Sequence, residues 1–285
     1  MLQFGSEYPR YVTPGFKPFD PVKLARKTEE IVTRIRNGRC ERKYTAFYAT
    51  GVYGGIATGY AVGCCLRCVF CWVGWSRDFP EKLGRFYSPE QAFEKLREAA
   101  HKYRVNKLRI SGAEPTLGKD HLLSLLEYVE DSEFPLFILE TNGILFGVDK
   151  DYVRKISRFE KVHVRVSLKA GTPEAFTRKT GAVPESFEIP FKAIENLLDY
   201  GVSFHVAAMS LDPRIMTPEE RASLIKKLAE IDVNLLLNLE EEIVDPYETT
   251  LARLKFAGFK LKWPLRELYT PIRNIIMKSE RENKK

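Results

Sequence analysis

The sequence lacks the features that mark membrane-spanning, secreted and repetitive proteins. No apolar stretch approaches the roughly 18 uninterrupted residues that indicate a transmembrane helix. Residues 1–10 contain no charged segment followed by an apolar one, so we expect no secretory signal. No internal repeat or low-complexity linker interrupts the chain. We therefore expect a cytoplasmic protein that does not bind a membrane.

Cysteine is scarce, and its placement is uneven. Of the five cysteines, four fall within residues 64–71, and the fifth is Cys40. A secreted disulfide scaffold would distribute its cysteines along a short chain. One cluster in an otherwise cysteine-poor chain instead predicts a metal or redox site in a reducing compartment.

The composition is that of a folded protein with a modest positive charge. The chain has 285 residues, of which 44% are apolar and 29% charged, enough for one large domain or two small ones. Lys and Arg number 45 against 38 Asp and Glu, which gives a net charge of +7. Such an excess is compatible with an acidic partner or RNA but requires neither.

Strand-like and helix-like hydrophobic patterns alternate from residue 56 onward. Two of the predicted helices begin with capping boxes, at residues 88–91 and 217–220. Before them, residues 22–37 are typical of a basic helix stopped by Gly38. The predicted strands are residues 56–63, 107–111, 136–139, 162–168, 202–209 and 234–239. The other predicted helices are residues 120–128, 150–158, 173–181, 187–200 and 246–258.

Six strands separated by helices predict an α/β fold with a parallel sheet and right-handed crossovers. Six units are too few for a closed eight-stranded barrel. An open, three-quarter barrel and a doubly wound sheet both fit this count. In either fold, ligands bind at the carboxyl ends of the strands.

Cysteine, glycine and polar residues follow each predicted strand. If the strands are parallel, these residues meet at one edge of the sheet and build a single site. The segments are residues 63–71, 112–115, 140–143, 167–169, 209–212 and 240–242.

The cysteine segment predicts a soft-metal site with an open coordination position. Cys64, Cys68 and Cys71 are separated by three and two residues, and neither a second cysteine pair nor a histidine lies nearby for a structural zinc. A ferredoxin-type set that starts at Cys65 fails, because Trp75 stands where its fourth cysteine belongs. Three ligands on a four-iron cluster would leave one iron open for chemistry. A structural metal knuckle is the alternative.

At these residues the sequence resembles the radical S-adenosylmethionine (SAM) superfamily. The spacing of Cys64, Cys68 and Cys71, with the aromatic Phe70 before the third cysteine, is similar to that family's signature. The resemblance implies a partial (β/α)6 TIM-like barrel and one [4Fe–4S] cluster on the three cysteines, with SAM on the fourth iron. It also implies an enzyme in which the reduced cluster cleaves SAM to methionine and a 5′-deoxyadenosyl radical. That radical then abstracts hydrogen from a substrate.

The resemblance spans roughly residues 47–238 and implies further SAM contacts. The segment of Gly112, Ala113, Glu114 and Pro115 resembles the family's Gly-Gly-Glu-Pro motif, with Ala113 in place of the second glycine. In that motif Glu114 would pair with the SAM amino group. Phe70 and Met209 would border the adenine.

A finer likeness points to the glycyl-radical activases, such as pyruvate formate-lyase activating enzyme. Glu140 and Thr141 are similar to residues that help to hold a monovalent cation beside SAM in those enzymes, and Lys169 to one near the SAM carboxylate and ribose. Ser167 stands where the activases have a second Asp, so the resemblance implies a weaker cation site or none.

The remaining cysteines and the nearby tryptophans have predicted roles as well. We expect Trp72 and Trp75 to pack over the cluster and shield it from water. Cys40 and Cys65 are too few for an auxiliary cluster, so we expect a single cluster and interpret both residues as small buried hydrophobes.

The resemblance leaves the substrate open. An activase acts on a protein. The wyosine tRNA enzymes, whose sequence is similar to the Phe-Cys-Trp of residues 70–72, act on RNA. Flavodoxin or ferredoxin is the expected electron donor. The alternative from another functional class is a non-catalytic Fe–S or zinc module, in which Cys65 or Cys40 would supply a fourth ligand.

We expect four segments along the chain. Residues 1–45 form an N-terminal extension with a helix, and residues 46–242 form the radical SAM core. Residues 243–277 form a C-terminal helical extension, and residues 278–285 a flexible tail rich in charge. The two extensions and the open side of the barrel are the expected substrate-contact surface.

Overall fold

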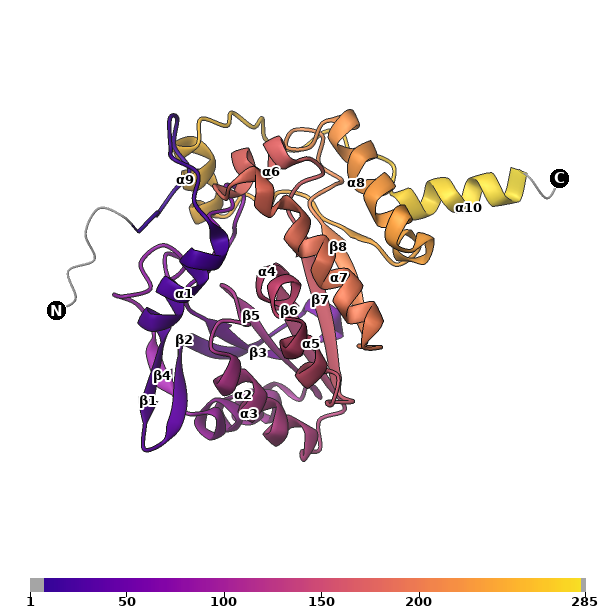
Figure 1. Ribbon diagram of the computed structural model, residues 1–285. Coiled ribbons are helices and arrows are strands. Elements are labelled where there is room, and N and C mark those ends of the chain that lie inside the picture. Colours follow the sequence, from indigo (N-terminus) through magenta and orange to yellow (C-terminus); the bar gives the residue numbers. More distant parts are fainter. Residues whose placement is uncertain (1–7, 283–285) are drawn as a thin grey trace.

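Six parallel strands form the centre of the molecule, which is described by a computed structural model for residues 8–282 (Figure 1). Within these residues nine strands form one sheet in the order β1-β2-β3-β5-β6-β7-β8-β9, with β4 beside β2. The strands are β1 (Thr33–Arg36), β2 (Arg39–Thr50), β3 (Ile56–Ala61), β4 (Arg85–Tyr87), β5 (Lys107–Gly112), β6 (Leu136–Thr141), β7 (Val162–Leu168), β8 (Phe204–Ala208) and β9 (Glu240–Glu241).

The parallel strands confirm the predicted α/β fold. β3, β5, β6, β7, β8 and β9 pair in parallel, each with the next. The sheet begins at β1 and ends at β9, so the barrel stays partial and open. The helices are α1 (Pro21–Val32), α2 (Pro89–Tyr103), α3 (Lys119–Glu130), α4 (Ile144–Val148), α5 (Lys150–Ile156), α6 (Pro173–Thr180), α7 (Ile189–Asp199), α8 (Pro218–Ile231), α9 (Glu248–Phe256) and α10 (Ile272–Glu282).

Helix α2 shows how local sequence signals set the element boundaries. Ser88 Oγ accepts a hydrogen bond from the Gln91 backbone N–H at 3.1 Å, and Gln91 Oε1 accepts one from the Ser88 N–H at 3.0 Å. This is the predicted capping box, and Pro89 occupies the first turn. Leu96 and the other apolar residues at helical spacing form the buried face of the helix. Thr217 caps α8 in a similar way.

The predicted helix over residues 22–37 is too long. Helix α1 ends at Val32, and the chain then forms the β1–β2 hairpin, whose long second strand the sequence analysis missed. Asn37 and Gly38 form the turn with left-handed φ values of 50° and 72°. An Asn-Gly pair is a strong hairpin signal, because both residues tolerate the left-handed region. The apolar residues before the turn have helical spacing, which does not indicate a hairpin.

The predicted strand over residues 234–239 is wrong. Val233–Leu236 forms a 3-10 turn, and the last parallel strand, β9, contains only Glu240–Glu241. The Asp232 carboxylate accepts a hydrogen bond from the Asn234 N–H at 2.9 Å, which stabilises the turn. The apolar run of leucines there was mistaken for a strand.

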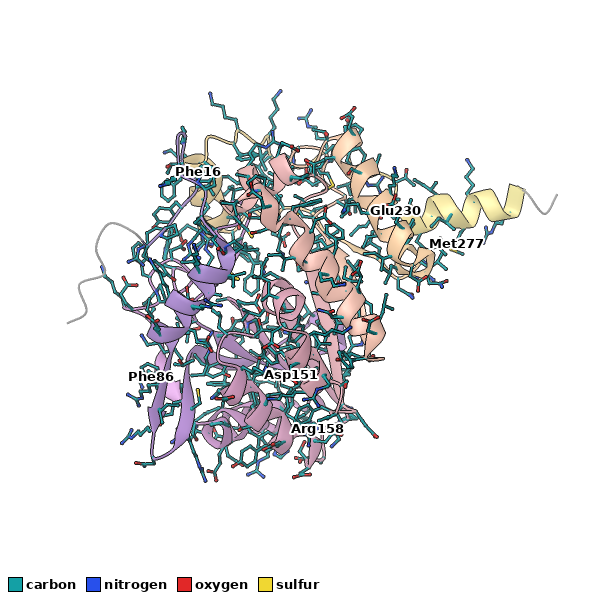
Figure 2. All side chains as sticks on the ribbon, in the orientation of Figure 1. Phe16, Phe86, Asp151, Arg158, Glu230 and Met277 are labelled. Carbon is teal, nitrogen blue, oxygen red and sulfur yellow. The ribbon has the colours of Figure 1, made fainter. Side chains whose placement is uncertain are left out.

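The two ends of the chain differ from the body of the molecule. Helix α10 extends away from the rest of the structure, and Met277 lies on it (Figures 1 and 2). Residues 278–282, expected to begin a flexible tail, continue this helix. Residues 1–7 and 283–285, which belong to the predicted extension and tail, lie outside the described residues. The division into four segments stays a prediction.

Within residues 8–282, no helix has both the length and the apolar character that crossing a bilayer requires.

A buried histidine ties the N-terminal hairpin to α3. His121 Nδ1 donates to the Cys40 carbonyl at 2.9 Å, and Nε2 accepts from the Tyr44 hydroxyl at 2.9 Å. A carbonyl can only accept, so this pair of partners fixes the neutral tautomer of the ring. Burial lowers the pKa of His121 to about 3.

We predict that His121 makes the folded state sensitive to mild acid. The unfolded histidine titrates near a pKa of about 6.5, so between that pH and about pH 3 the unfolded chain binds a proton that the folded chain does not. The free energy of unfolding should fall as the pH drops below about 6.5, by at most about 1.4 kcal/mol per pH unit from this group.

Urea unfolding at pH 7.5 and pH 5.5 measures this dependence. His121→Gln should lose part of the difference in unfolding free energy between the two pH values. The exposed His101→Gln is the control and should keep it. Equal pH dependence in all three proteins would contradict the prediction.

Candidate cofactor site at the carboxyl ends of the strands

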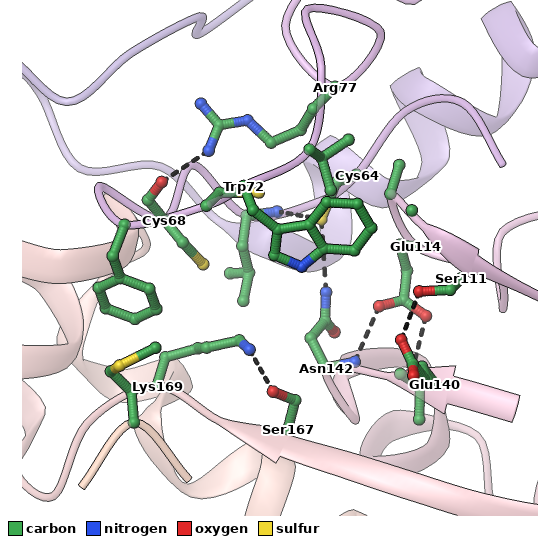
Figure 3. Close-up of a pocket in the computed structure, with 18 of the residues that line it drawn as sticks. Cys64, Cys68, Trp72, Arg77, Ser111, Glu114, Glu140, Asn142, Ser167 and Lys169 are labelled. Carbon is green, nitrogen blue, oxygen red and sulfur yellow. Dashed lines mark hydrogen bonds between the residues drawn. The ribbon is translucent and has the colours of Figure 1, made fainter. Parts of the chain in front are cut away.

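One cavity lies at the carboxyl ends of the parallel strands (Figure 3). The space between its lining residues is about 750 Å³, which includes open solvent. Every residue that the sequence analysis assigned to the site lines this cavity: Cys64, Cys68, Phe70, Cys71, Gly112, Ala113, Glu114, Glu140, Thr141, Ser167, Lys169 and Met209.

The cysteine loop leaves β3 at a point where only glycine fits. Gly63 has a φ of +81°, and a Cβ there would lie 2.6 Å from Thr28 Cγ2 on α1. The loop therefore passes directly under α1 before it presents its thiols. Cys68 is buried, whereas Cys64 and Cys71 are partly exposed. Burial raises the pKa of the Cys68 thiol to about 12.

The three thiols form the donor set of the site. Cys64, Cys68 and Cys71 all line the cavity. Thiolates are soft ligands, and a four-iron cubane offers a separate iron to each of three thiolates. The chemistry of the donor set thus fits a [4Fe–4S] cluster.

The other two cysteines lie outside this cavity. The buried Cys65 Sγ accepts a hydrogen bond from Asn142 Nδ2 at 3.3 Å. Cys40 lines a separate hollow between the β1–β2 hairpin and α3. The side chains that face the cavity therefore include three thiols and not five.

Glu114 is held by a dense set of donors. Its Oε1 accepts from the Thr116 N–H at 3.1 Å, the Thr116 hydroxyl at 2.6 Å and the Thr141 hydroxyl at 2.7 Å. Its Oε2 accepts from the Asn142 N–H at 2.9 Å. Burial raises the pKa of this carboxyl, and the hydrogen bonds from Thr116 and Asn142 oppose that rise. Oε2 has a lone pair left for one more donor.

Gly112 allows the chain to turn between β5 and Glu114. Its φ is +95°, and a Cβ would lie 3.2 Å from the Ala61 carbonyl oxygen on the neighbouring strand. Glycine therefore lets β5 turn sharply and directs Glu114 into the cavity.

Glu140 already has a cationic partner. Arg109 Nη1 donates to Glu140 Oε1 at 2.8 Å, and the Tyr53 hydroxyl donates to the same oxygen at 3.2 Å. Ser111 Oγ makes a short contact with the other carboxylate oxygen. On the next strand Lys169 Nζ contacts Ser167 Oγ. The carboxylate that the activase likeness placed beside a monovalent cation is thus ion-paired with an arginine.

The sequence analysis missed several residues that line the cavity. Asn142 donates to Cys64 at 3.6 Å and to Cys65, and so connects the cysteine loop with the strand that carries Glu140. Arg165 lies two residues before Ser167 on β7, and the two-residue period of a strand places both on one face, so this signal was available. Val73, Arg77 and Ser111 also line the cavity and were not predicted, whereas Leu66, Asn142 and Glu242 lie in the predicted strand-end segments but received no individual role.

The two tryptophans of the cysteine loop differ in position. Trp72 lines the cavity and is 42% exposed, so it covers the mouth only in part. Trp75 packs edge-on against Tyr11 at 6.2 Å, with the Arg253 guanidinium over its ring, and does not line the cavity. The expected packing over the cluster therefore applies to Trp72.

The fold and the three-cysteine cavity define a protein that binds a cluster and a small ligand at the open end of an α/β barrel. The chain matches the model of the Radical SAM superfamily over residues 60–228, more than half of its length. It belongs to this superfamily, whose members use a [4Fe–4S] cluster and SAM, and it is a radical SAM enzyme.

Curated relatives carry a narrower description. The chain is 29% identical over 140 residues to a "Probable GTP 3',8-cyclase" of Methanococcus maripaludis. The matched stretch covers 49% of this chain and 44% of the relative. It is 31% identical over 158 residues to a protein of the same description from Methanosarcina acetivorans. Here the matched stretch covers 53% of this chain and 45% of the relative. The chain thus spans less than half the length of these two relatives.

A solved structure agrees on the fold. Streptococcus suis SuiB bound to its precursor peptide SuiA superposes with a TM-score of 0.54 at 15% identity, over 85% of this chain and 46% of SuiB. The comparisons give no support to the finer likeness to glycyl-radical activases. The predicted superfamily is confirmed, whereas the activase branch has no support from these relatives.

We predict that Glu114→Gln destabilises the folded chain. A glutamine has one acceptor oxygen, so either orientation sets its NH2 group against a backbone N–H, of Thr116 or of Asn142. A buried donor without a partner costs about 1–3 kcal/mol. Urea unfolding should show a loss of this size, whereas the exposed Glu127→Gln should change little. A stability equal to that of the unchanged protein would show that these bonds carry little free energy.

Proposed function

We propose that Cys64, Cys68 and Cys71 hold one [4Fe–4S] cluster and that SAM binds beside it in the same cavity. The observation that carries this proposal is the convergence of the three thiols and the expected SAM contacts on one cavity. When bound, the cluster supplies one electron that breaks the sulfonium C–S bond of SAM, which yields methionine and a 5′-deoxyadenosyl radical. The chain's own residues bind, orient and shield these groups.

Glu114 and Lys169 are suited to the charged end of SAM. Glu114 Oε2 can accept a further hydrogen bond, so an ammonium fits there. Lys169 is a cation that lines the cavity and would attract the carboxylate, with Ser167 beside it. Phe70 and Met209 add apolar surface for the adenine.

Arg109 takes the place that the activase likeness gave to a monovalent cation. Its guanidinium is nearly buried and ion-paired with Glu140 at 2.8 Å. A fixed cation on β5 compensates the Glu140 carboxylate without a bound ion. We therefore propose that Glu140 and Thr141 shape the cavity wall, with Thr141 bonded to Glu114.

The substrate is the least constrained part of the proposal. GTP is the first candidate, because the curated relatives are described as GTP cyclases and share about 30% identity with this chain. A protein or RNA substrate rests only on finer sequence likenesses. Flavodoxin or ferredoxin as electron donor and a cytoplasmic location stay predictions.

Anaerobic reconstitution with iron, sulfide, SAM and dithionite tests the proposed chemistry. The unchanged protein should bind about four irons per chain and release 5′-deoxyadenosine. Changing any one of Cys64, Cys68 or Cys71 to Ala should reduce 5′-deoxyadenosine to background, because each thiolate holds a different iron. Cys65→Ala is the matched control and should keep the cluster. Loss of the cluster in Cys65→Ala would point to a fourth protein ligand and contradict the proposal.

A second experiment tests the substrate. With deuterated GTP as the substrate, deuterium should appear in 5′-deoxyadenosine, because the radical takes hydrogen from the bound molecule. Parallel reactions contain cell-extract fractions treated with protease or with RNase. If 5′-deoxyadenosine carries no deuterium from GTP and forms with an untreated fraction but not after protease or RNase treatment, GTP is not the substrate, and the sensitivity identifies the class of substrate.

A further inference from the structure

Helix α9 holds the cysteine loop from the side that faces away from the cavity. Arg253 is 2% exposed and follows the loop by about 180 residues. Its Nη1 donates to the Cys71 carbonyl at 2.6 Å and to the Val73 carbonyl, and its Nη2 donates to the Gly74 carbonyl at 3.1 Å. Thr250, one turn earlier, donates to the Cys71 carbonyl at 3.3 Å. One guanidinium thus donates hydrogen bonds to three carbonyls of the loop.

A buried aspartate joins this arginine to a second one. Asp78 is fully buried and forms ion pairs with both Arg253 and Arg77. Arg77 Nη1 donates to the Cys68 carbonyl at 2.7 Å. The three side chains, which we call the arginine clamp, therefore fix the carbonyls of two of the three cysteines. A clamp of two arginines and one aspartate carries one net positive charge.

The clamp has two physical effects on a cluster in this cavity. Bound carbonyls hold the loop in one conformation, so less conformational entropy is lost when the thiolates take up iron. A net positive charge buried next to the loop also favours the more negative, reduced cluster, which raises its reduction potential. Arg253 contributes to both effects from helix α9, outside residues 60–228 that match the family, whereas Arg77 and Asp78 lie within them.

We propose that Arg253 is a positioning residue, which acts through the arginine clamp to preorganise the cysteine loop and raise the reduction potential of the cluster. This inference rests on the proposed function, since it concerns the cluster assigned to Cys64, Cys68 and Cys71. The chain's C-terminal part is then required for efficient cluster binding.

Two substitutions at Arg253 distinguish the positioning of the loop from the effect of the positive charge on the reduction potential. Arg253→Lys keeps the charge but has too few donors in too small a head group for three carbonyls and Asp78. It should lower bound iron by half or more and leave the potential of the remaining clusters unchanged. Arg253→Gln removes the charge as well, so its remaining clusters should also have a lower potential. Iron and sulfide analysis and an EPR-monitored redox titration give these values.

A control variant and a second measurement test whether the effects are specific to Arg253. Lys255→Gln removes a charge from the exposed side of the same helix and should match the unchanged protein. Alkylation of Cys68 in the cluster-free protein reports loop mobility and should be several-fold faster in Arg253→Gln. If that variant does not fold, Thr250→Val, which removes only one bond to the Cys71 carbonyl, should still speed alkylation.

The outcomes distinguish the two proposals. If the unchanged protein takes up no cluster, the proposed function fails. If it takes up a cluster but Arg253→Gln matches it in iron content, potential and alkylation rate, only the role of the clamp is overturned.

Discussion

The candidate site depends on backbone hydrogen bonds that hold an irregular loop in place. The loop from Gly63 to Trp75 has buried N–H and carbonyl groups that neither a helix nor a strand can pair, and each must find another partner. Arg67 N–H donates to the Thr180 carbonyl at 2.8 Å and Val69 N–H to the Lys179 carbonyl at 2.9 Å, so α6 holds one side. Glu114 N–H donates to the Gly63 carbonyl at 2.9 Å. The thiols are therefore positioned by segments from the whole chain, with α9 among them.

Asn142 shows how two parts of the site act as one. Its backbone N–H holds Glu114, and its side-chain amide donates to Cys64 and Cys65. A hydrogen bond from Cys65 also lowers the pKa of the Cys64 thiol to about 7, which favours its thiolate. The acid expected to bind SAM and the first cysteine expected to bind iron are thus separated by one side chain. Movement of either strand end would disturb both.

The sequence predicted the parts of the fold that depend on local signals. Capping residues such as Ser88 and Thr217, and the alternation of strand and helix patterns, are properties of short segments, and the structure follows them. The β1–β2 hairpin and the late start of β9 were missed, because an apolar pattern alone does not distinguish a helix end from a strand. The cavity residues at strand ends were found because parallel topology brings them together. Arg77 and Arg253 could not be found, because they act on carbonyls whose positions only the folded loop defines.

The cavity carries compensated charges beside its apolar side chains, and these charges constrain what can bind there. Arg165 faces the cavity with its guanidinium bonded to Glu240 at 2.8 Å and to Glu242 at 2.8 Å. Burial opposes ionisation of Glu240, but Arg165 and His205 outweigh it and hold its pKa far below the usual range. An anionic group that pairs with Arg165 must compete with these two carboxylates. Arg165 donates two hydrogen bonds to Glu240, which also pairs with His205, but only one to Glu242, so Glu242 is the partner that is displaced more easily. Release of Glu242 is thus the change that would make the Arg165 guanidinium available to an anionic group in the cavity.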